Sequence, residues 1–331
     1  MIKRVAVMGA GSWGTTVASL LSERVSTVLW ARRQEVVEDI SNGRGNQRYL
    51  PGVDLPDELC ATTDVVKAVE GADLVLVAVP SHGFRQVLVA AQTSIASGIP
   101  VISLAKGFEQ GTYLRMTQVV SEVIPDRPVG VLTGPNIARE ILLRHSAATV
   151  VACNSESVAK DLQFLLTSER LRVYTNDDIV GCEIGGAVKN VIALASGVAE
   201  GLGTGDNARA ALITRGLAEL TRLGEALGSD PRTLTGLAGL GDVLVTCISR
   251  QSRNRWFGEQ IGSGRSVEEI LNTMNQVAEG VRSAGVVCEL ASQVGVEVPI
   301  AQGVRAVIDD GRDPLQVWEE LMTRQVRSEA D

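Results

Sequence analysis

The sequence has 331 residues, enough for two domains that each bury a core. Hydrophobic residues make up 45% of the chain and charged residues 21%, which excludes the disordered and fibrous classes. The formal net charge of −8 argues against a general nucleic-acid binder and against a protein held electrostatically at a membrane surface.

The first half of the sequence alternates short apolar runs with helical patterns. Six runs are rich in β-branched residues and lack polar alternation: 4–8, 27–30, 74–78, 101–104, 129–132 and 148–152. Strands covered on both faces have this pattern, and they belong to parallel sheets with crossover helices. We therefore expect an α/β domain over residues 1–185, with a doubly wound, mostly parallel sheet.

After about residue 181 the pattern changes to helical spacing. Residues 182–202 are rich in Gly, Ala, Val and Ile, and residues 208–227 place leucines at helical intervals. Ser266 and Glu269 have the spacing of a capping box, and Asp313 precedes a proline suited to the first helical position. Residues 186–331 are therefore predicted to form an all-α domain.

A glycine-rich turn follows the first predicted strand directly. Gly9, Gly11 and Gly14 have the spacing G-x-G-x-x-G, with Ser12 and Trp13 before the last glycine. In such turns the first glycine allows the tight bend, the second lets the backbone approach a pyrophosphate, and the third lets helix and strand pack closely. The helix N-terminus then offers N–H groups to the phosphates. The motif predicts a Rossmann domain that binds a dinucleotide, and a purely structural turn is the alternative.

The end of the second predicted strand bears on the choice of cofactor. NAD enzymes usually place an acidic residue there, on the ribose 2′-hydroxyl. This sequence has Arg32 and Arg33, and two guanidinium groups suit the 2′-phosphate of NADPH. A solvated pair that begins the next helix is the competing explanation, and NADH use stays open.

Two lysines and one aspartate are candidate catalytic residues. Lys106 follows a predicted strand and should lie at the carboxyl edge of the sheet, where ligands bind in such folds. Lys189 is the only ionisable residue between positions 184 and 199, so its burial requires an anion and would lower its pKa toward the range of acid–base catalysis. Asp242 and Thr246 would share one helix face. A snorkelling Lys189 at a helix edge is the alternative.

Residues 249–255, Ser-Arg-Gln-Ser-Arg-Asn-Arg, form a basic, hydroxyl-rich stretch in an acidic protein. Ser252, Arg253 and Asn254, together with backbone amides, are suited to holding a phosphate group. A solvated loop is the competing interpretation.

The cysteines and histidines predict no metal site. Five cysteines are scattered along the chain without a C-x-x-C pair, which indicates buried free thiols in a reducing compartment. The two histidines have no adjacent carboxylate pair, so we expect neither zinc chemistry nor a Ser-His-Asp triad. Glycines interrupt the apolar N-terminus, and the apolar segment 184–199 is short for a bilayer span. We therefore expect a cytoplasmic protein without a membrane or nucleic-acid partner.

The motifs above form part of a longer ordered series along the chain. Its segments are 9–14, 48–51, 104–107, 132–135, 183–190, 239–242, 252–254 and 277–280. In order and spacing, this series resembles the bacterial NAD(P)-dependent sn-glycerol-3-phosphate dehydrogenases, and the resemblance covers nearly the whole chain. It implies an N-terminal Rossmann domain and a C-terminal helical domain with the active site between them. It also implies hydride transfer between NAD(P)H and dihydroxyacetone phosphate, which supplies sn-glycerol 3-phosphate for phospholipid synthesis.

The resemblance also implies roles for individual residues. The residues expected to bind the cofactor are Gly9, Gly11, Ser12, Trp13, Gly14, Arg32, Arg33, Lys106, Ala138, Arg253, Val277 and Glu279. Those expected to surround the substrate are Lys106, Gly134, Asn136, Lys189, Asp242, Ser252, Arg253 and Asn254. Many family members have Gly-Pro-Ser-Phe-Ala where this chain has Gly-Pro-Asn136-Ile-Ala138. An amide can still donate and accept hydrogen bonds, so we expect activity to survive.

These roles combine into one expected mechanism. Lys189 would give its proton to the ketone oxygen as the hydride arrives, Lys106 would hold the substrate, and Asp242 would orient the Lys189 amine. Two alternatives stay open: a related two-domain dehydrogenase of another hydroxy or keto acid, and a non-catalytic NADPH sensor. The apolar helical half is compatible with a homodimer, although no segment marks an interface.

Overall fold

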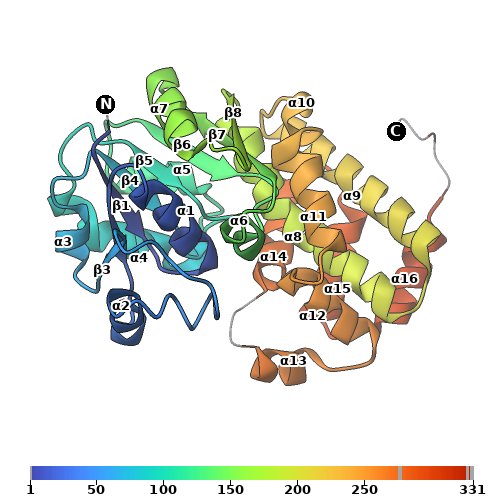
Figure 1. The fold of residues 1–331 in the computed structure, drawn as a ribbon. Coiled ribbons are helices and arrows are strands. Elements are labelled where there is room, and N and C mark those ends of the chain that lie inside the picture. Colours follow the sequence, from blue (N-terminus) through green and yellow to red (C-terminus); the bar gives the residue numbers. More distant parts are fainter. Residues whose placement is uncertain (1, 275–277, 326–327, 329–331) are drawn as a thin grey trace.

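The computed structural model describes residues 2–274, 278–325 and 328. An α/β part and a helical part lie side by side (Figure 1). The strands of the first part are β1 (Arg4–Met8), β2 (Ser26–Trp30), β3 (Cys60–Thr62), β4 (Leu74–Val77), β5 (Val101–Ser103), β6 (Val129–Thr133), β7 (Ala147–Cys153) and β8 (Leu171–Asn176). They form one sheet in the order β3-β2-β1-β4-β5-β6-β7-β8. All neighbouring strands are parallel except β6 and β7, so the sheet is mostly parallel as predicted.

Helices cover both faces of this sheet. They are α1 (Ser12–Ser22), α2 (Gln34–Ser41), α3 (Val65–Val69), α4 (Ser81–Ala91), α5 (Met116–Val123), α6 (Ala138–Leu142) and α7 (Glu156–Leu166). Val5 and Val7 of β1 pack in one core with α1, α2, α6 and α7, whereas Ala6 and Met8 pack in the other with α3, α4 and α5. Because successive side chains of a strand enter opposite cores, neither face can be polar.

The helical part begins with a long helix that the other helices surround. Its elements are α8 (Ile179–Gly201), α9 (Asp206–Ala226), α10 (Pro231–Leu234), a π-helical turn (Leu237–Gly241), α11 (Asp242–Ile248), α12 (Arg253–Gly262), α13 (Val267–Thr273), α14 (Glu279–Val294), α15 (Pro299–Ile308) and α16 (Pro314–Met322). By length and composition alone, α8 could cross a membrane. The apolar segment 184–199 was too short to suggest this, because the helix extends beyond it at both ends. In the structure, however, 89% of the most apolar window of α8 is buried inside the fold. Burial on all sides explains why α8 is apolar all round.

Most of the predicted elements are confirmed. All six predicted runs are strands, the second half is helical, and Ser266 with Glu269 forms a capping box at α13. The sequence did not indicate β3, which has only three residues. It also did not indicate β8, in which buried and exposed residues alternate at the start of the strand. The predicted domain limit at residue 185 falls within α8, which continues through it. The prediction that every cysteine is buried is wrong for Cys60, which is exposed on β3 near the sheet edge.

Candidate active site

The glycine-rich turn joins β1 to α1 with very little space around two of its glycines. Gly9 has a φ of +125°, which favours glycine, and a Cβ there would lie 2.8 Å from the carbonyl carbon of Ala78. A Cβ on Gly14 would lie 2.0 Å from the carbonyl oxygen of Gly9. A Cβ on Gly11, in contrast, would meet no described atom within 4 Å. The turn is therefore tight against β4 and open beside the N-terminus of α1, where a pyrophosphate fits.

The loop that follows α2 holds this turn in place. Asn46 is fully buried and donates hydrogen bonds to the carbonyl oxygen of Ala10 at 2.9 Å and to Thr15 Oγ1 at 2.8 Å. Ser12 Oγ donates to the carbonyl oxygen of Tyr49 at 3.0 Å. Trp13 Nε1 is buried and finds no hydrogen-bond partner among the described residues, so it has a donor to offer to a ligand.

Positive charge collects beyond the end of β2. Arg32 and Arg33 are exposed there, and Arg33 Nη1 lies 3.7 Å from a Glu35 carboxylate oxygen. His82 is in the first turn of α4, and partial burial lowers its pKa, as do the positive charges of Arg282 and Arg32. Arg282 belongs to α14, so both parts of the chain contribute cations to this region.

Three charged groups meet where the two parts of the chain touch. Lys106 Nζ, just past β5, donates to Asp242 Oδ2 at 2.7 Å and to the carbonyl oxygen of Gly134 at 2.9 Å. Lys189 Nζ, on α8, donates to Asp242 Oδ1 and, at 3.0 Å, to Thr246 Oγ1. Asp242 itself is fully buried at the start of α11. One carboxylate thus lies between two ammonium groups, which leaves a net charge of about +1 if all three are ionised.

Burial controls the acidity of Lys189. Its side chain is only 8% exposed, and this burial lowers the pKa of the ammonium group to about 8. Asp242 opposes the change and Lys106 adds to it. An amine with such a pKa exchanges a proton near neutrality, which a solvent-exposed lysine does not do efficiently. A snorkelling Lys189 is therefore excluded.

The N-terminus of α12 lies close to this cluster. Ser252 caps the helix, and its hydroxyl accepts a hydrogen bond from the N–H of Arg255. Asn254 Nδ2 donates to Asn190 Oδ1 at 2.8 Å, and Asn254 Oδ1 accepts from the N–H of Gly280 at 2.9 Å. The side chain of Asn254 therefore joins α8, α12 and α14.

Polar groups without partners also lie beside the cluster. Thr133 Oγ1 and both side-chain amide atoms of Asn136 are buried and have no hydrogen-bond partner among the described residues. A Cβ on Gly186 would lie 3.0 Å from Thr133 Oγ1, so this part of α8 packs closely on the end of β6. Buried unpaired polar atoms are costly, and a ligand at this place would satisfy them.

Two further predicted cofactor residues lie at the starts of α6 and α14. Ala138 begins α6. Glu279 begins α14, and burial raises its pKa, whereas the positive charges of Arg253 and Lys189 lower it. Val277 lies outside the described residues. Within the described part of the chain, no group of three or more His, Cys, Asp or Glu residues is placed to hold a metal ion.

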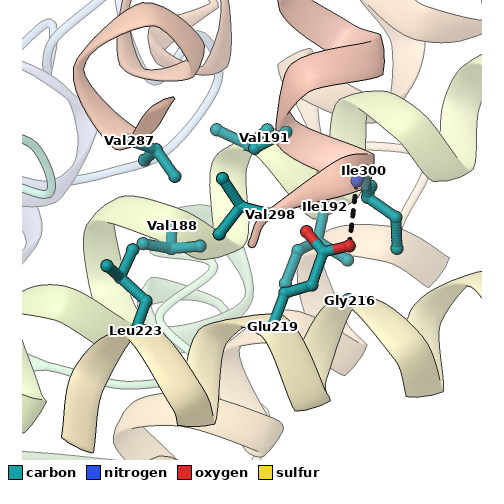
Figure 2. A pocket seen from close by; sticks show the side chains of 10 residues that line it. Val188, Val191, Ile192, Gly216, Glu219, Leu223, Val287, Val298 and Ile300 are labelled. Carbon is teal, nitrogen blue, oxygen red and sulfur yellow. Dashed lines mark hydrogen bonds between the residues drawn. The ribbon is translucent and has the colours of Figure 1, made fainter. Parts of the chain in front are cut away.

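A second buried carboxylate, Glu219 on α9, lies apart from this cluster. Its Oε1 accepts a hydrogen bond from the N–H of Ile300 at 2.9 Å, in the first turn of α15 (Figure 2). A small apolar cavity beside it is lined by Val188 and Val191 of α8, among others. Burial raises the pKa of Glu219 to about 7, although the backbone hydrogen bonds oppose the change. Because Glu219 accepts this hydrogen bond in the first turn of α15, we assign it to stability.

Comparison with known proteins gives the family. The model of the N-terminal part of NAD-dependent glycerol-3-phosphate dehydrogenase matches residues 4–159, and the model of its C-terminal part matches residues 178–319. The chain belongs to the NAD-dependent glycerol-3-phosphate dehydrogenase family. The second match begins at Asp178, the residue that caps α8.

Individual members of the glycerol-3-phosphate dehydrogenase family agree over nearly full length. A glycerol-3-phosphate dehydrogenase [NAD(P)+] of Thermobifida fusca is 51% identical over 330 residues, which cover 98% of each chain. One from Sphingopyxis alaskensis is 49% identical and covers 99% of this chain and 98% of its own. The crystal structure of glycerol-3-phosphate dehydrogenase from Coxiella burnetii superposes with a TM-score of 0.94 at 37% identity, covering 97% of this chain and 99% of that one.

Sequence reasoning brought together the lysines, Asp242 and the α12 turn, but it missed several residues around the candidate site. Asn46 had no signal beyond its place before the segment 48–51. Asn190 stood in a quoted motif, yet only the structure gives it a partner in Asn254. Thr133 and Arg255 lie within the segments 132–135 and 249–255, but the sequence analysis assigned no role to either of them. A lone polar residue beside a motif has no recognisable spacing, so contacts across the fold are needed to find it.

Proposed function

We propose that the protein interconverts dihydroxyacetone phosphate and sn-glycerol 3-phosphate with NAD(P)H as the hydride donor. Family membership supports this reading, and the single observation that carries it is the buried cluster of Lys106, Lys189 and Asp242. The cluster lies between the dinucleotide-type turn of the α/β part and the phosphate-type turn of α12. It is the only group of ionised side chains we can assign to proton transfer among the described residues.

Charge explains the chemistry of the two lysines. The bound reduced nicotinamide supplies a hydride to the ketone carbon. Negative charge then develops on the ketone oxygen, and the Lys189 ammonium group stabilises it and delivers the proton. Lys106 adds positive charge and holds the substrate, while Asp242 keeps both amines oriented. In the oxidative direction, neutral Lys189 takes the proton from the alcohol.

The phosphate of the substrate is assigned to the start of α12. Ser252, Arg253 and the N–H group of Asn254 lie there, at the start of a helix of ten residues whose N-terminus favours an anion. The Asn254 side chain is already engaged with Asn190 and Gly280, so we assign its backbone to the phosphate. Binding energy from the phosphate then serves to position the reacting carbon.

Gly134, Asn136 and Thr133 complete the proposed substrate site. The carbonyl oxygen of Gly134 already accepts from Lys106, which fixes that amine. The unpaired amide of Asn136 replaces the serine of many relatives and offers both a donor and an acceptor. We propose that substrate or cofactor satisfies these groups when it binds.

The cofactor is assigned to the turn between β1 and α1. Gly9, Gly11 and Gly14 shape the turn, and Ser12 and Trp13 begin the helix whose N–H groups face the pyrophosphate. Arg32 and Arg33 would bind the 2′-phosphate of NADPH, with NADH as the alternative. Ala138, Glu279 and Val277 complete the proposed contacts, which include Lys106 and Arg253.

The decisive experiment follows absorbance of the reduced nicotinamide with purified protein and dihydroxyacetone phosphate, using NADPH and NADH in turn. Turnover with dihydroxyacetone phosphate, and none with ketopantoate or 3-hydroxy acids, is expected. Preference for a carboxylate substrate would favour a related dehydrogenase, and cofactor binding without turnover would favour a sensor.

The biological setting follows from the reaction. A product that carries both a hydroxyl group and a phosphate suits phospholipid synthesis, which we propose as the pathway, in the cytoplasm. A homodimer is also proposed, and size-exclusion chromatography with light scattering tests it.

A further inference from the structure

Helices α8 and α12 lie side by side and run in the same direction. Their contacting residues are separated by a constant number of positions in the chain. Asn254 donates to Asn190, 64 positions earlier in the chain. Leu194 and Gly258 have the same separation, and so do Val198 and Gly262. A Cβ on Gly258 would lie 2.0 Å from the carbonyl oxygen of Leu194, and one on Gly262 would lie 2.3 Å from that of Val198.

The contact is equally close from the other side. A Cβ on Gly197 of α8 would lie 2.0 Å from the carbonyl oxygen of Arg255, and one on Gly201 would lie 2.3 Å from that of Glu259. The two backbones therefore meet without intervening side chains. Such packing fixes the distance between the helices, but small residues alone resist sliding along the axis poorly.

An ion pair between a buried guanidinium group and a partly exposed carboxylate supplies the resistance to sliding. Arg255 follows the phosphate-type segment 252–254 directly, and its side chain is 8% exposed. Its Nη2 donates to Glu200 Oε1 at 2.6 Å, and Glu200 lies in the last turn of α8. Glu200 also lies 3.3 Å from Arg209 of α9. A buried guanidinium group held by a carboxylate of the neighbouring helix is costly to displace.

The register of these helices sets the geometry of the proposed substrate site. Lys189 lies on α8, and the proposed phosphate site lies at the start of α12. Sliding by one helical turn would shift the proposed phosphate site relative to the Lys189 amine by about 5.4 Å. A short substrate could then not reach both groups. Misplacement by about 1 Å already costs up to about a hundredfold in rate.

We propose that Arg255 is a positioning residue for the substrate. Through its ion pair with Glu200 it holds the start of α12 at the separation from the Lys189 amine that a three-carbon phosphate ester bridges. Arg255 does not touch the substrate. The proposal rests on the proposed function, and it makes the spacing of α8 and α12 the selector of substrate length.

The test compares one substrate with phosphate and one without. Arg255→Met should lower kcat/KM for dihydroxyacetone phosphate by about 10- to 100-fold. It should change kcat/KM for dihydroxyacetone, which has no phosphate to place, by less than about twofold. Arg255→Lys should fall between, because an ammonium group cannot make the same fork contacts. Arg305→Met is the matched control, because it removes an exposed ion pair with Glu289 elsewhere in the helical part.

If Arg255 had only a structural role, Arg255→Met would lower the turnover of both substrates together, and that result would overturn the proposal. Unchanged turnover of both substrates would overturn it as well. Circular dichroism verifies folding, and Arg255→Lys carries the test if the methionine variant does not fold. If the wild-type protein does not reduce dihydroxyacetone phosphate, the proposed function fails. The positioning role of Arg255 is then tested separately, by measuring the binding of inorganic phosphate with calorimetry. Binding at least tenfold weaker in Arg255→Met then supports the positioning role. Equal binding, or none in the wild type, overturns it.

Discussion

Replacement of Asp242 by asparagine tests the electrostatic balance of the site. The change keeps the size of the side chain and one oxygen, but it removes the negative charge that pairs with both Lys106 and Lys189. The variant would hold two ammonium groups in a buried place without the carboxylate that both of them contact. Burial already lowers the pKa of Lys189 to about 8. We therefore expect Asp242→Asn to release the proton of Lys189.

The size of the effect follows from Coulomb's law. At a separation of about 4 Å and an effective dielectric constant of about 20, one unit charge contributes about 4 kcal/mol. That energy corresponds to roughly a thousandfold change in proton affinity, since about 1.4 kcal/mol is tenfold. Even a third of this effect would bring the pKa of Lys189 to neutrality or below. The amine would then be largely neutral at the pH where the wild-type protein holds it as an ammonium ion.

The assay is the pH dependence of kcat/KM in both directions. Ketone reduction needs the ammonium form, so the wild-type value should be level below about pH 8 and fall above it. Asp242→Asn should begin to fall at least one pH unit lower, and alcohol oxidation should reach its plateau correspondingly earlier. Asp39→Asn on α2, which removes the partner of exposed Arg44, should leave the profile unchanged. A reduction profile in Asp242→Asn that coincides with the wild-type profile would refute the reasoning.

Three further predictions concern single side chains. Lys189→Ala should lower kcat by about 10²- to 10⁴-fold, the usual contribution of a general acid, and leave the NADPH affinity measured by fluorescence nearly unchanged; unchanged turnover would remove Lys189 from the mechanism. Arg33→Asp should weaken NADPH about 10- to 100-fold relative to NADH in titrations, because a charged hydrogen bond to phosphate is replaced by repulsion. The raised pKa of Glu219, about 7, means that the folded state holds this proton more tightly than the unfolded chain, so stability falls as pH rises from about 4.5 to 7, by about 3 kcal/mol in total. Glu219→Gln keeps an acceptor for Ile300 and should remove this loss in denaturant unfolding at pH 5 and pH 8; an equal pH dependence in both proteins contradicts the assignment.

Local pattern was sufficient for most of the α/β part. The strands that enter two cores, such as β1 and β4, must be apolar throughout, and this requirement is visible in the sequence. β8 was missed because it lies at the sheet edge, where exposed Arg172 and Tyr174 break the apolar run. The antiparallel direction of β7 was not visible either, since the composition of a buried strand is the same in both directions.

Some of the candidate active-site residues could also be found from a local pattern, whereas their contacts with one another could not. Lys189 could be picked out because a single charge in an apolar helix demands a partner, and Lys106 because it follows a strand. Their common partner, Asp242, lies 53 positions from Lys189 and 136 from Lys106 in the chain. No local pattern encodes such a contact, and the role expected of Asp242 came from the family resemblance. The register of α8 and α12 was beyond reach because the glycines of each helix, although four residues apart, do not identify the helix that they contact.

The same carboxylate connects the chemistry of the site with the stability of the fold. Lys106 belongs to the α/β part, whereas Lys189 and Asp242 belong to the helical part, so the ion pair of Lys106 with Asp242 also fastens one part to the other. A buried ion pair is costly to form, and removing only one of its two partners destabilises the protein strongly. Because the cluster carries two cations and one anion, it is incompletely balanced until an anionic substrate arrives. Substrate binding should therefore strengthen the contact between the two parts, and the residues that prepare the proton transfer also select the arrangement in which it takes place.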